Sequence, residues 1–222
     1  MNLTALFFIV LFVTVQSTEK PDHWVILVAG SKGFWNYRHQ ADICHAYQIM
    51  KDNGVPEDQI IVFSFDDVAH DSQNPFPGKL FNKKDGHDVY DGCKIDYRGE
   101  DVTPTKFLSI LRGEGDGKTL KSDENSKVFI NFADHGAPGL IAFPNDELYA
   151  RDFHKTLHEM HSAKKYGEMT IYIEACESGS MFQDILEDNI NVYATTAADP
   201  HESSWAYYCA PDDTVDGVSI GS

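Results

Sequence analysis

The feature that most constrains the fold of this chain is a series of short apolar runs, each followed by small or polar residues. The first run, His23-Trp-Val-Ile-Leu-Val-Ala29, is apolar throughout, which is typical of a strand buried on both faces. Similar patterns predict strands at 59–65, 128–133, 140–143, 169–175 and 190–196, and helices at 39–51, 104–111 and 148–165. Because strands alternate with helices, we expect an α/β domain with a mostly parallel sheet flanked by helices.

Composition and charge exclude several classes of partner. The chain has 222 residues, 42% of them hydrophobic, which suffices for one domain with a substantial core. Its formal net charge of −17 argues against binding to nucleic acids, which usually requires a basic face, and against docking on anionic membranes. We therefore expect neither nucleic acid nor a membrane as a partner.

The N-terminus has the pattern of a secretory signal. Leu6-Phe-Phe-Ile-Val-Leu-Phe-Val13 is too short for a comfortable membrane span and is followed by polar residues. A buried first strand is the alternative interpretation. We predict a signal peptide at residues 1–17, cleaved near Ser17, and a folded domain over 18–222 that enters the secretory pathway.

The four cysteines, Cys44, Cys93, Cys176 and Cys209, do not suggest a metal site. Their spacings match no zinc motif, and no CxxC pair occurs. Four cysteines are compatible with disulfides, but if one is catalytic the others cannot all pair with one another. We expect no metal and no cofactor, and the sequence leaves the disulfide pairing open.

Polar clusters follow three of the predicted strands. Residues 36–39 come after the first strand, Asp134-His135-Gly136 after the third long run, and residues 174–180 after the fourth. In open α/β sheets, ligands bind outside the carboxyl ends of the strands. Taken alone, Cys176 could be a small buried hydrophobe and His135 an ordinary loop histidine.

Together, these two residues form a plausible nucleophile and base at one sheet edge. An imidazolium and the N-terminus of a following helix would both lower the pKa of the Cys176 thiol. Gly136 would bring its backbone N–H close to a reacting carbonyl, where it could stabilise an oxyanion.

The residues around this pair resemble the legumain family of caspase-like cysteine peptidases, the asparaginyl endopeptidases or haemoglobinases, and helminth members in particular. The matching blocks are Asn36-Tyr-Arg-His-Gln-Ala-Asp42, Phe132-Ala-Asp-His-Gly-Ala-Pro-Gly139, Tyr172-Ile-Glu-Ala-Cys-Glu-Ser-Gly-Ser-Met181 and Asn189-Ile-Asn-Val-Tyr-Ala-Thr-Thr-Ala-Ala198. The resemblance runs from Trp24 to about Ser204 and implies a caspase-like three-layer sandwich.

The resemblance implies a role for each residue of the catalytic cluster. Cys176 is expected to attack the scissile carbonyl, His135 to act as the acid and base, and Asn36 to position the imidazole. The backbone N–H groups of Gly136 and Cys176 are expected to hold the oxyanion. Asp134 occupies the position that in the family forms a succinimide and is tied to peptide-ligase behaviour.

The resemblance also implies a substrate pocket for asparagine at P1, the residue before the cleaved bond. Its expected residues are Arg38, His39, Glu174, Ser203 and Ser204. An asparagine carboxamide carries one acceptor and two donor hydrogens, and a pocket with both Arg and acidic groups can satisfy both ends. We expect cleavage after Asn, and slow cleavage after Asp at acidic pH. Without the resemblance, the favoured interpretation is that Arg38 forms a surface ion pair and that Glu174 is a solvated carboxylate at a strand end.

The implied biology is that of a secreted, lysosomal or vacuolar endopeptidase, or one of the gut lumen, that digests proteins or processes zymogens. Cystatin-type inhibitors are expected partners by the same resemblance.

Lys32, Asp199 and Trp205 depart from the residues common in the family. The sequence stops at Ser222, before a Leu-Gly-Asp segment and a helical prodomain, so we expect the peptidase domain to be C-terminally incomplete.

Two alternatives remain open from the sequence. A GPI-transamidase-like catalytic subunit shares the fold and the Cys–His pair, but that family usually has Gly before the histidine, where this chain has Asp134. A truncated, inactive homologue acting as a binder is the second alternative. The intact Cys176, His135 and Asn36 argue against it.

Overall fold

The computed structural model describes residues 22–208, 214–215 and 217–220. The predicted signal peptide and Cys209 lie outside the described residues. Among the described helices, none is both long enough and apolar enough to cross a membrane.

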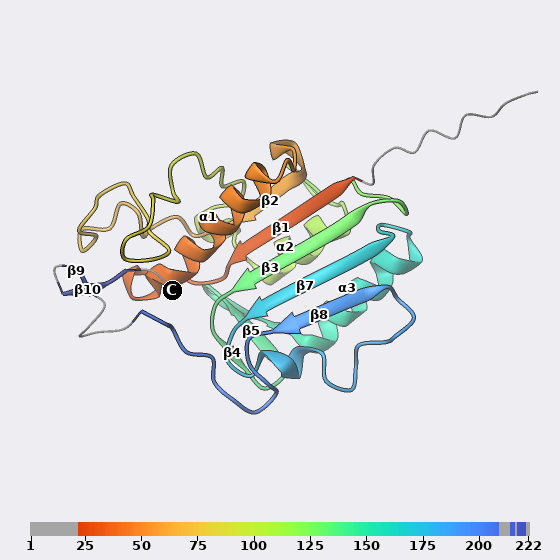
Figure 1. Cartoon of the computed structure of the whole chain (residues 1–222). Coiled ribbons are helices and arrows are strands. Elements are labelled where there is room, and N and C mark those ends of the chain that lie inside the picture. The colour runs from red at the N-terminus through yellow and green to blue at the C-terminus, as the bar shows by residue number, and fades with distance from the viewer. Residues whose placement is uncertain (1–21, 209–213, 216, 221–222) are drawn as a thin grey trace, which may run out of the picture.

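The fold is built on a five-stranded parallel sheet with the strand order β2-β1-β3-β7-β8 (Figure 1). Its strands are β1 (His23–Ala29), β2 (Ile60–Phe63), β3 (Lys127–Ala133), β7 (Glu168–Glu174) and β8 (Val192–Thr196). Side chains of β1 alternate between two apolar cores, with Ile26 and Val28 in one and Val25 and Leu27 in the other. The first apolar run lacks polar positions because both faces of β1 are covered.

Helices lie on both sides of this sheet. α1 (Tyr37–Asp52) covers one face, and α2 (Pro104–Leu111) and α3 (Ala150–Ser162) cover the other (Figure 1). Helix α1 contributes Ile43 and Tyr47 to one core, whereas α2 and α3 contribute Phe107 and Phe153 to the other. The predicted three-layer α/β arrangement is confirmed.

Several predicted boundaries are wrong by a few residues. The helix predicted from residue 148 begins at Ala150, because β6 (Asp146–Tyr149) pairs with β5 (Leu140–Phe143), which pairs in turn with β4 (Gly136–Ala137). The second and last long strands are also shorter than predicted. The remaining elements are four 3-10 helices, Phe34–Asn36, Glu57–Gln59, Gly99–Asp101 and Ser178–Met181, and the ladder of β9 (Thr214–Val215) with β10 (Val218–Ser219).

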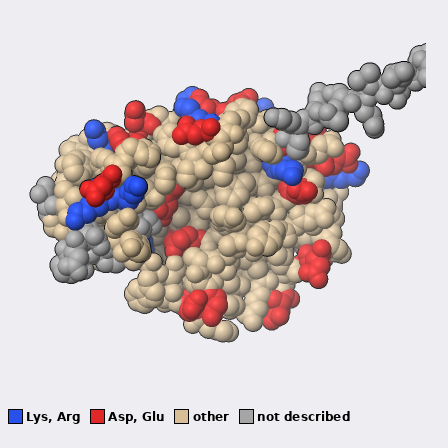
Figure 2. Space-filling model, in the orientation of Figure 1, with Lys and Arg blue, Asp and Glu red and all other residues tan. Residues whose placement is uncertain are grey.

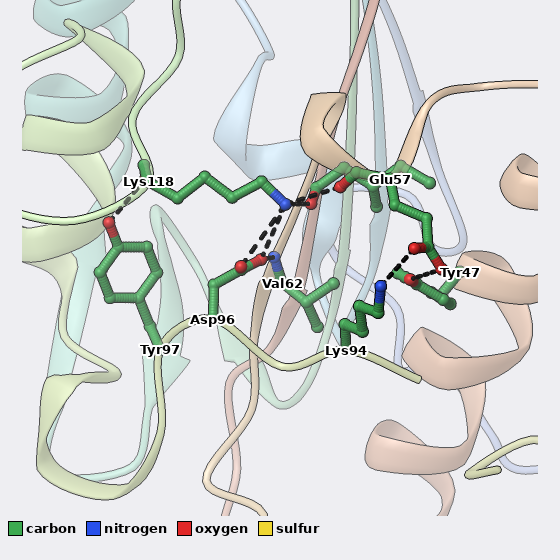
Figure 3. A network of polar contacts seen from close by, with 8 residues as sticks. Tyr47, Glu57, Val62, Lys94, Asp96, Tyr97 and Lys118 are labelled. Atoms are coloured by element: carbon green, nitrogen blue, oxygen red, sulfur yellow. Dashed lines mark hydrogen bonds and ion pairs between the residues drawn. The ribbon is translucent and has the colours of Figure 1, made fainter. Parts of the chain in front are cut away.

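The segment between β2 and α2 is irregular, as predicted, and side chains tie it to the framework. A disulfide joins Cys44 of α1 to Cys93 of this segment, which resolves a pairing that the sequence left open. Figure 3 shows a second attachment beside β2, where the Asp96 carboxylate accepts a hydrogen bond from the Val62 N–H at 2.9 Å. Lys118 donates to the Glu57 carbonyl at 2.7 Å in the same network.

Charged side chains are unevenly distributed on the face shown in Figure 2. Basic side chains lie beside acidic ones near the upper margin, whereas the lower part of this face carries acidic side chains only. This side of the molecule therefore offers no broad basic surface to a polyanion.

Candidate active site

Three neighbouring strands end at the same level and bring the polar clusters together. Ala29 of β1 pairs with Ala133 of β3, and Ala133 pairs with Glu174 of β7. The Asp134 N–H then donates to the Glu174 carbonyl at 3.0 Å. As a result, the residues that follow β3 and those that follow β7 leave the sheet side by side.

Gly136 and Cys176 approach each other more closely than a side chain would permit. A Cβ atom added to Gly136 would lie 2.3 Å from the Cys176 carbonyl oxygen, which is a backbone atom and cannot swing away. The two loops are also joined by the Gly139 N–H, which donates to the Ser180 hydroxyl at 2.8 Å. Glycine at position 136 is thus required by close approach of the two loops that carry the candidate dyad.

The imidazole of His135 is held by Asn36, the last residue of the 3-10 helix before α1. Its Nε2 lies 2.8 Å from the Asn36 side-chain oxygen, and the Asn36 amide donates to the Lys32 carbonyl at 2.9 Å. Since an amide oxygen can only accept, Nε2 carries the proton and Nδ1 of the neutral ring carries a lone pair. Burial lowers the pKa of His135, and the nearby Asp134 carboxylate opposes this shift.

Cys176 is a free, partly buried cysteine, and its Sγ lies 3.6 Å from the Ser204 carbonyl oxygen. Within the described part of the chain, the α-helix expected to follow Cys176 is absent. Residues Ser178–Met181 form only a short 3-10 helix, because Glu177 takes a left-handed conformation with φ 50° and turns the chain. The Glu177 N–H donates to the Glu202 carbonyl at 2.8 Å, which anchors this turn to the segment after β8.

A buried polar cluster lies directly behind His135. The rings of His39 and His135 meet edge to face with centroids 5.1 Å apart. His39 Nδ1 lies 2.7 Å from the Ser31 hydroxyl oxygen and 3.2 Å from Asp134 Oδ1. Burial lowers the pKa of His39 to about 3 and raises that of Asp134 to about 7, so both groups are uncharged in moderately acidic solution.

Ser31 is a member of this cluster that the sequence reasoning missed. It follows the end of β1, as Asp134 follows β3, and this position was the signal that could have identified it.

The structure brings part of the predicted substrate pocket together. The Ser204 hydroxyl donates to the Glu174 carboxylate, which places Ser204 beside both Glu174 and the Cys176 sulfur. Arg38 lines a cavity of about 450 Å³ whose walls include Trp35, Tyr208 and Val218.

The other two predicted pocket residues, His39 and Ser203, differ from each other in exposure. His39 is fully buried, whereas Ser203 is exposed.

A larger cavity lies elsewhere on the molecule. It has a volume of about 920 Å³ and is lined by residues of α2, β6 and α3, including Arg112, Glu147 and Lys155. None of the candidate catalytic or pocket residues lines it. Among the candidate catalytic and pocket residues, Arg38 alone lines the smaller cavity.

Comparison with known proteins agrees with the resemblance seen in the sequence. Residues 23–221 match the Peptidase C13 family. Human legumain (Homo sapiens) is 55% identical over 193 residues, which cover 84% of this chain and 44% of legumain. The hemoglobinase of Schistosoma mansoni is 52% identical over 205 residues, which cover 91% of this chain and 48% of that protein.

A plant relative shows the same pattern. The vacuolar-processing enzyme delta-isozyme of Arabidopsis thaliana is 53% identical over 205 residues, which cover 88% of this chain and 44% of the plant protein. The chain thus spans about half the length of the curated relatives that it matches. The predicted family resemblance is confirmed.

Proposed function

Because the chain belongs to the Peptidase C13 family, we propose that it carries the catalytic residues of a cysteine endopeptidase that cleaves on the carboxyl side of asparagine. The observation that carries this proposal is the 2.8 Å contact of His135 Nε2 with the Asn36 oxygen. It leaves the lone pair of Nδ1 available for proton transfer, at the same sheet edge as the free Cys176.

The first half of the reaction forms an acyl-enzyme. The Cys176 thiol gives its proton to His135 Nδ1, and the sulfur adds to the scissile carbonyl carbon. The backbone N–H groups of Gly136 and Cys176 receive the oxyanion. When the carbon–nitrogen bond breaks, the proton on His135 goes to the leaving amine, so the new amino terminus departs neutral.

The second half releases the acid product. His135 takes a proton from a water molecule, whose oxygen adds to the acyl carbon. The carbon–sulfur bond then breaks, and the proton on His135 returns to the sulfur. Asn36 holds the ring in one orientation through both halves, which keeps Nδ1 as the nitrogen that exchanges the proton.

Asparagine specificity follows from donors and acceptors on opposite sides of the pocket. Arg38 donates to the carboxamide oxygen, and the carboxylate of Glu174, positioned by Ser204, accepts from its NH₂ group. His39 supports the wall, and Ser203 adds a hydroxyl at the rim. Ionised aspartate would place a carboxylate against Glu174, so cleavage after aspartate requires acidic solution, where that side chain is protonated.

A matched pair of peptide substrates tests the reaction and the pocket separately. We expect the full-length protein at acidic pH to cleave a peptide with Asn at P1 faster than the Gln counterpart by roughly 100-fold, since Gln adds one methylene. Cys176→Ser should abolish cleavage of both peptides. Absence of any cleavage that depends on Cys176 would contradict the peptidase assignment, and equal rates for Asn and Gln would contradict only the pocket.

The cellular setting is part of the proposal. The names legumain, hemoglobinase and vacuolar-processing enzyme of the relatives support proteolysis in a lysosome-like, vacuolar or secreted compartment. We place this protein in the secretory pathway, with protein substrates and zymogens as candidates and cystatin-type proteins as candidate inhibitors. Asp134, buried beside His135, is a candidate for a peptide-ligase side activity.

A further inference from the structure

Three potential metal ligands converge behind the candidate dyad. One ligand atom from each of His39, Asp134 and His135 lies within 4.8 Å of the other two. His39 and Asp134 are buried, whereas His135 is exposed and gives access from solvent. Asp134 and His135 follow the end of β3 and His39 lies in α1, so the fold itself assembles the cluster at the sheet edge.

Two atoms of this cluster are buried without any hydrogen-bond partner. They are His39 Nε2 and Asp134 Oδ1. Buried polar atoms are usually satisfied, and leaving one unpaired costs roughly 1–3 kcal/mol. A shared cation would satisfy both atoms at once.

Both histidines already have the surroundings of metal ligands. His39 Nδ1 lies 2.7 Å from the Ser31 oxygen, and His135 Nε2 lies 2.8 Å from the Asn36 oxygen. Metal-binding histidines commonly donate their second ring N–H to such an oxygen, which directs the lone pair of the other nitrogen at the ion. We assign the His39 proton to Nδ1, which also lies 3.2 Å from Asp134 Oδ1, so the lone pairs of His39 Nε2 and His135 Nδ1 are the ones left for a ligand.

We propose that His39, Asp134 and His135 form an inhibitory binding site for Zn²⁺ or a chemically similar transition-metal ion. Two imidazoles and one carboxylate are a donor set that suits Zn²⁺. Neighbouring ligands of a tetrahedral zinc ion are about 3.3 Å apart, so the exposed His135 ring closes onto the ion by roughly 1 Å. The positive charge of Arg38 disfavours the ion, and the negative charge of the Glu174 carboxylate offsets that of Arg38.

The ion would inhibit because it occupies the nitrogen that exchanges the proton. With Nδ1 of His135 bound to zinc, the ring can neither accept the proton of Cys176 nor protonate the leaving amine. This site is not a cofactor site, and the expectation that the enzyme needs no metal is unaffected. The prediction that zinc inhibits the enzyme rests on the proposed function, whereas the prediction that zinc binds does not.

Binding is tested in the Cys176→Ser protein, in which the thiolate cannot act as the zinc ligand. Isothermal titration with Zn²⁺ should show one ion bound per chain. Adding Asp134→Asn should weaken binding by more than about tenfold. Adding Ser31→Ala should weaken it by about tenfold, because His39 Nδ1 loses its contact with the Ser31 hydroxyl. Circular dichroism checks that each variant is folded, and Ser31→Ala keeps the test valid if Asp134→Asn does not fold.

Surface histidines provide the matched control. His158 lies 3.4 Å from Glu187 on the surface and could hold zinc adventitiously. We expect His158→Gln to leave the zinc affinity unchanged. The proposal is overturned if zinc binds the Cys176→Ser protein and its Asp134→Asn and Ser31→Ala derivatives equally well, or if binding disappears in His158→Gln. Failure of peptide cleavage in the zinc-free wild type would contradict only the proposed function.

Discussion

The two sides of the candidate site are built differently. The strand-end side holds Asp134 and His135, whose positions are set by the register of β1, β3 and β7 and by side-chain contacts to Asn36 and Ser31. The other side is the segment after β8, in which Trp205 is 86% exposed and Tyr207 is 80% exposed. It is joined to the strand-end side by the hydrogen bond from Ser204 to Glu174 and by the Glu177 N–H, which donates to the Glu202 carbonyl.

This difference indicates that the two sides of the site have separate roles, one in proton transfer and the other in substrate selection. Proton transfer requires fixed geometry, and the ends of three paired strands supply it. In the proposed pocket, Ser203 and Ser204 belong to a segment outside the regular elements, where residues can change without disturbing the sheet. Changes on the strand-end side should therefore act mainly on kcat, and changes after β8 mainly on KM and selectivity.

The largest effect is expected from Gly136→Ala. The new Cβ would lie 2.3 Å from the Cys176 carbonyl oxygen, so the two loops must separate and the oxyanion donors lose their positions. We expect kcat to fall by about 10²–10³-fold, as for loss of an oxyanion donor. Gly167→Ala is the matched control, because its Cβ would lie 2.7 Å from the Glu124 oxygen, in the turn before β7. It should lower stability and leave kcat of the folded enzyme unchanged.

Asn36→Ala should have the next largest effect. It removes the hydrogen bond that orients His135, which corresponds to about a tenfold loss of kcat. KM should change less than kcat, because Asn36 is not a residue of the proposed pocket. Steady-state kinetics with one Asn peptide measure this, and a change confined to KM would place Asn36 on the substrate side instead.

Ser204→Ala should produce a smaller effect on the other side of the site. Glu174 loses a hydrogen-bond donor, so its carboxylate is less well positioned for the P1 carboxamide. We expect kcat/KM for Asn peptides to fall roughly fivefold, mostly through KM. Ser162→Ala, at the exposed end of α3, is the control. A loss confined to kcat would contradict the proposed division.

The last effect is on stability, not on catalysis, and concerns Asp134. Its pKa is raised by burial from 3.8 to about 7, so the folded state keeps a proton that the unfolded state releases. Its stabilising contribution is present below about pH 4 and is lost as the pH rises through 7. Asp134→Asn has no carboxyl group at this position, so the loss of stability with rising pH does not occur in the variant. The free energy of unfolding of the variant, relative to wild type, should therefore increase between pH 4 and pH 7.

Urea unfolding at several pH values measures this difference in the free energy of unfolding. The difference should not rise by more than about 1.4 kcal/mol per pH unit, which is the limit for one proton. His39 contributes with the opposite sign, because its pKa is lowered to about 3, so its stabilisation is lost as the pH falls from 6.5. His39 is common to both proteins. Asp188→Asn, at an exposed position, is the control and should show no such pH-dependent difference. A difference for Asp134→Asn that does not change with pH would contradict the raised pKa.

Much of the framework could be predicted because burial leaves a pattern in the sequence. The predicted strand from His23 to Ala29 and the predicted helix at 104–111 have correct boundaries. A doubly buried strand and a helix start in which an N-cap Thr103 precedes Pro104 both have local signatures. The hairpin before α3 was missed. Residues 146–149 pair with β5 through backbone hydrogen bonds, which residue identity does not encode strongly.

The sequence by itself determined the α/β class, the family blocks and the candidate residues at the carboxyl ends of the strands. Only the tertiary structure decided which nitrogen of His135 faces Asn36, that Ser31 joins His39 and Asp134, that Cys44 pairs with Cys93, and that a 3-10 turn follows Cys176. Hydrophobic periodicity records which face of an element is buried. Hydrogen-bond partners distant in sequence depend on how the strand ends meet in space.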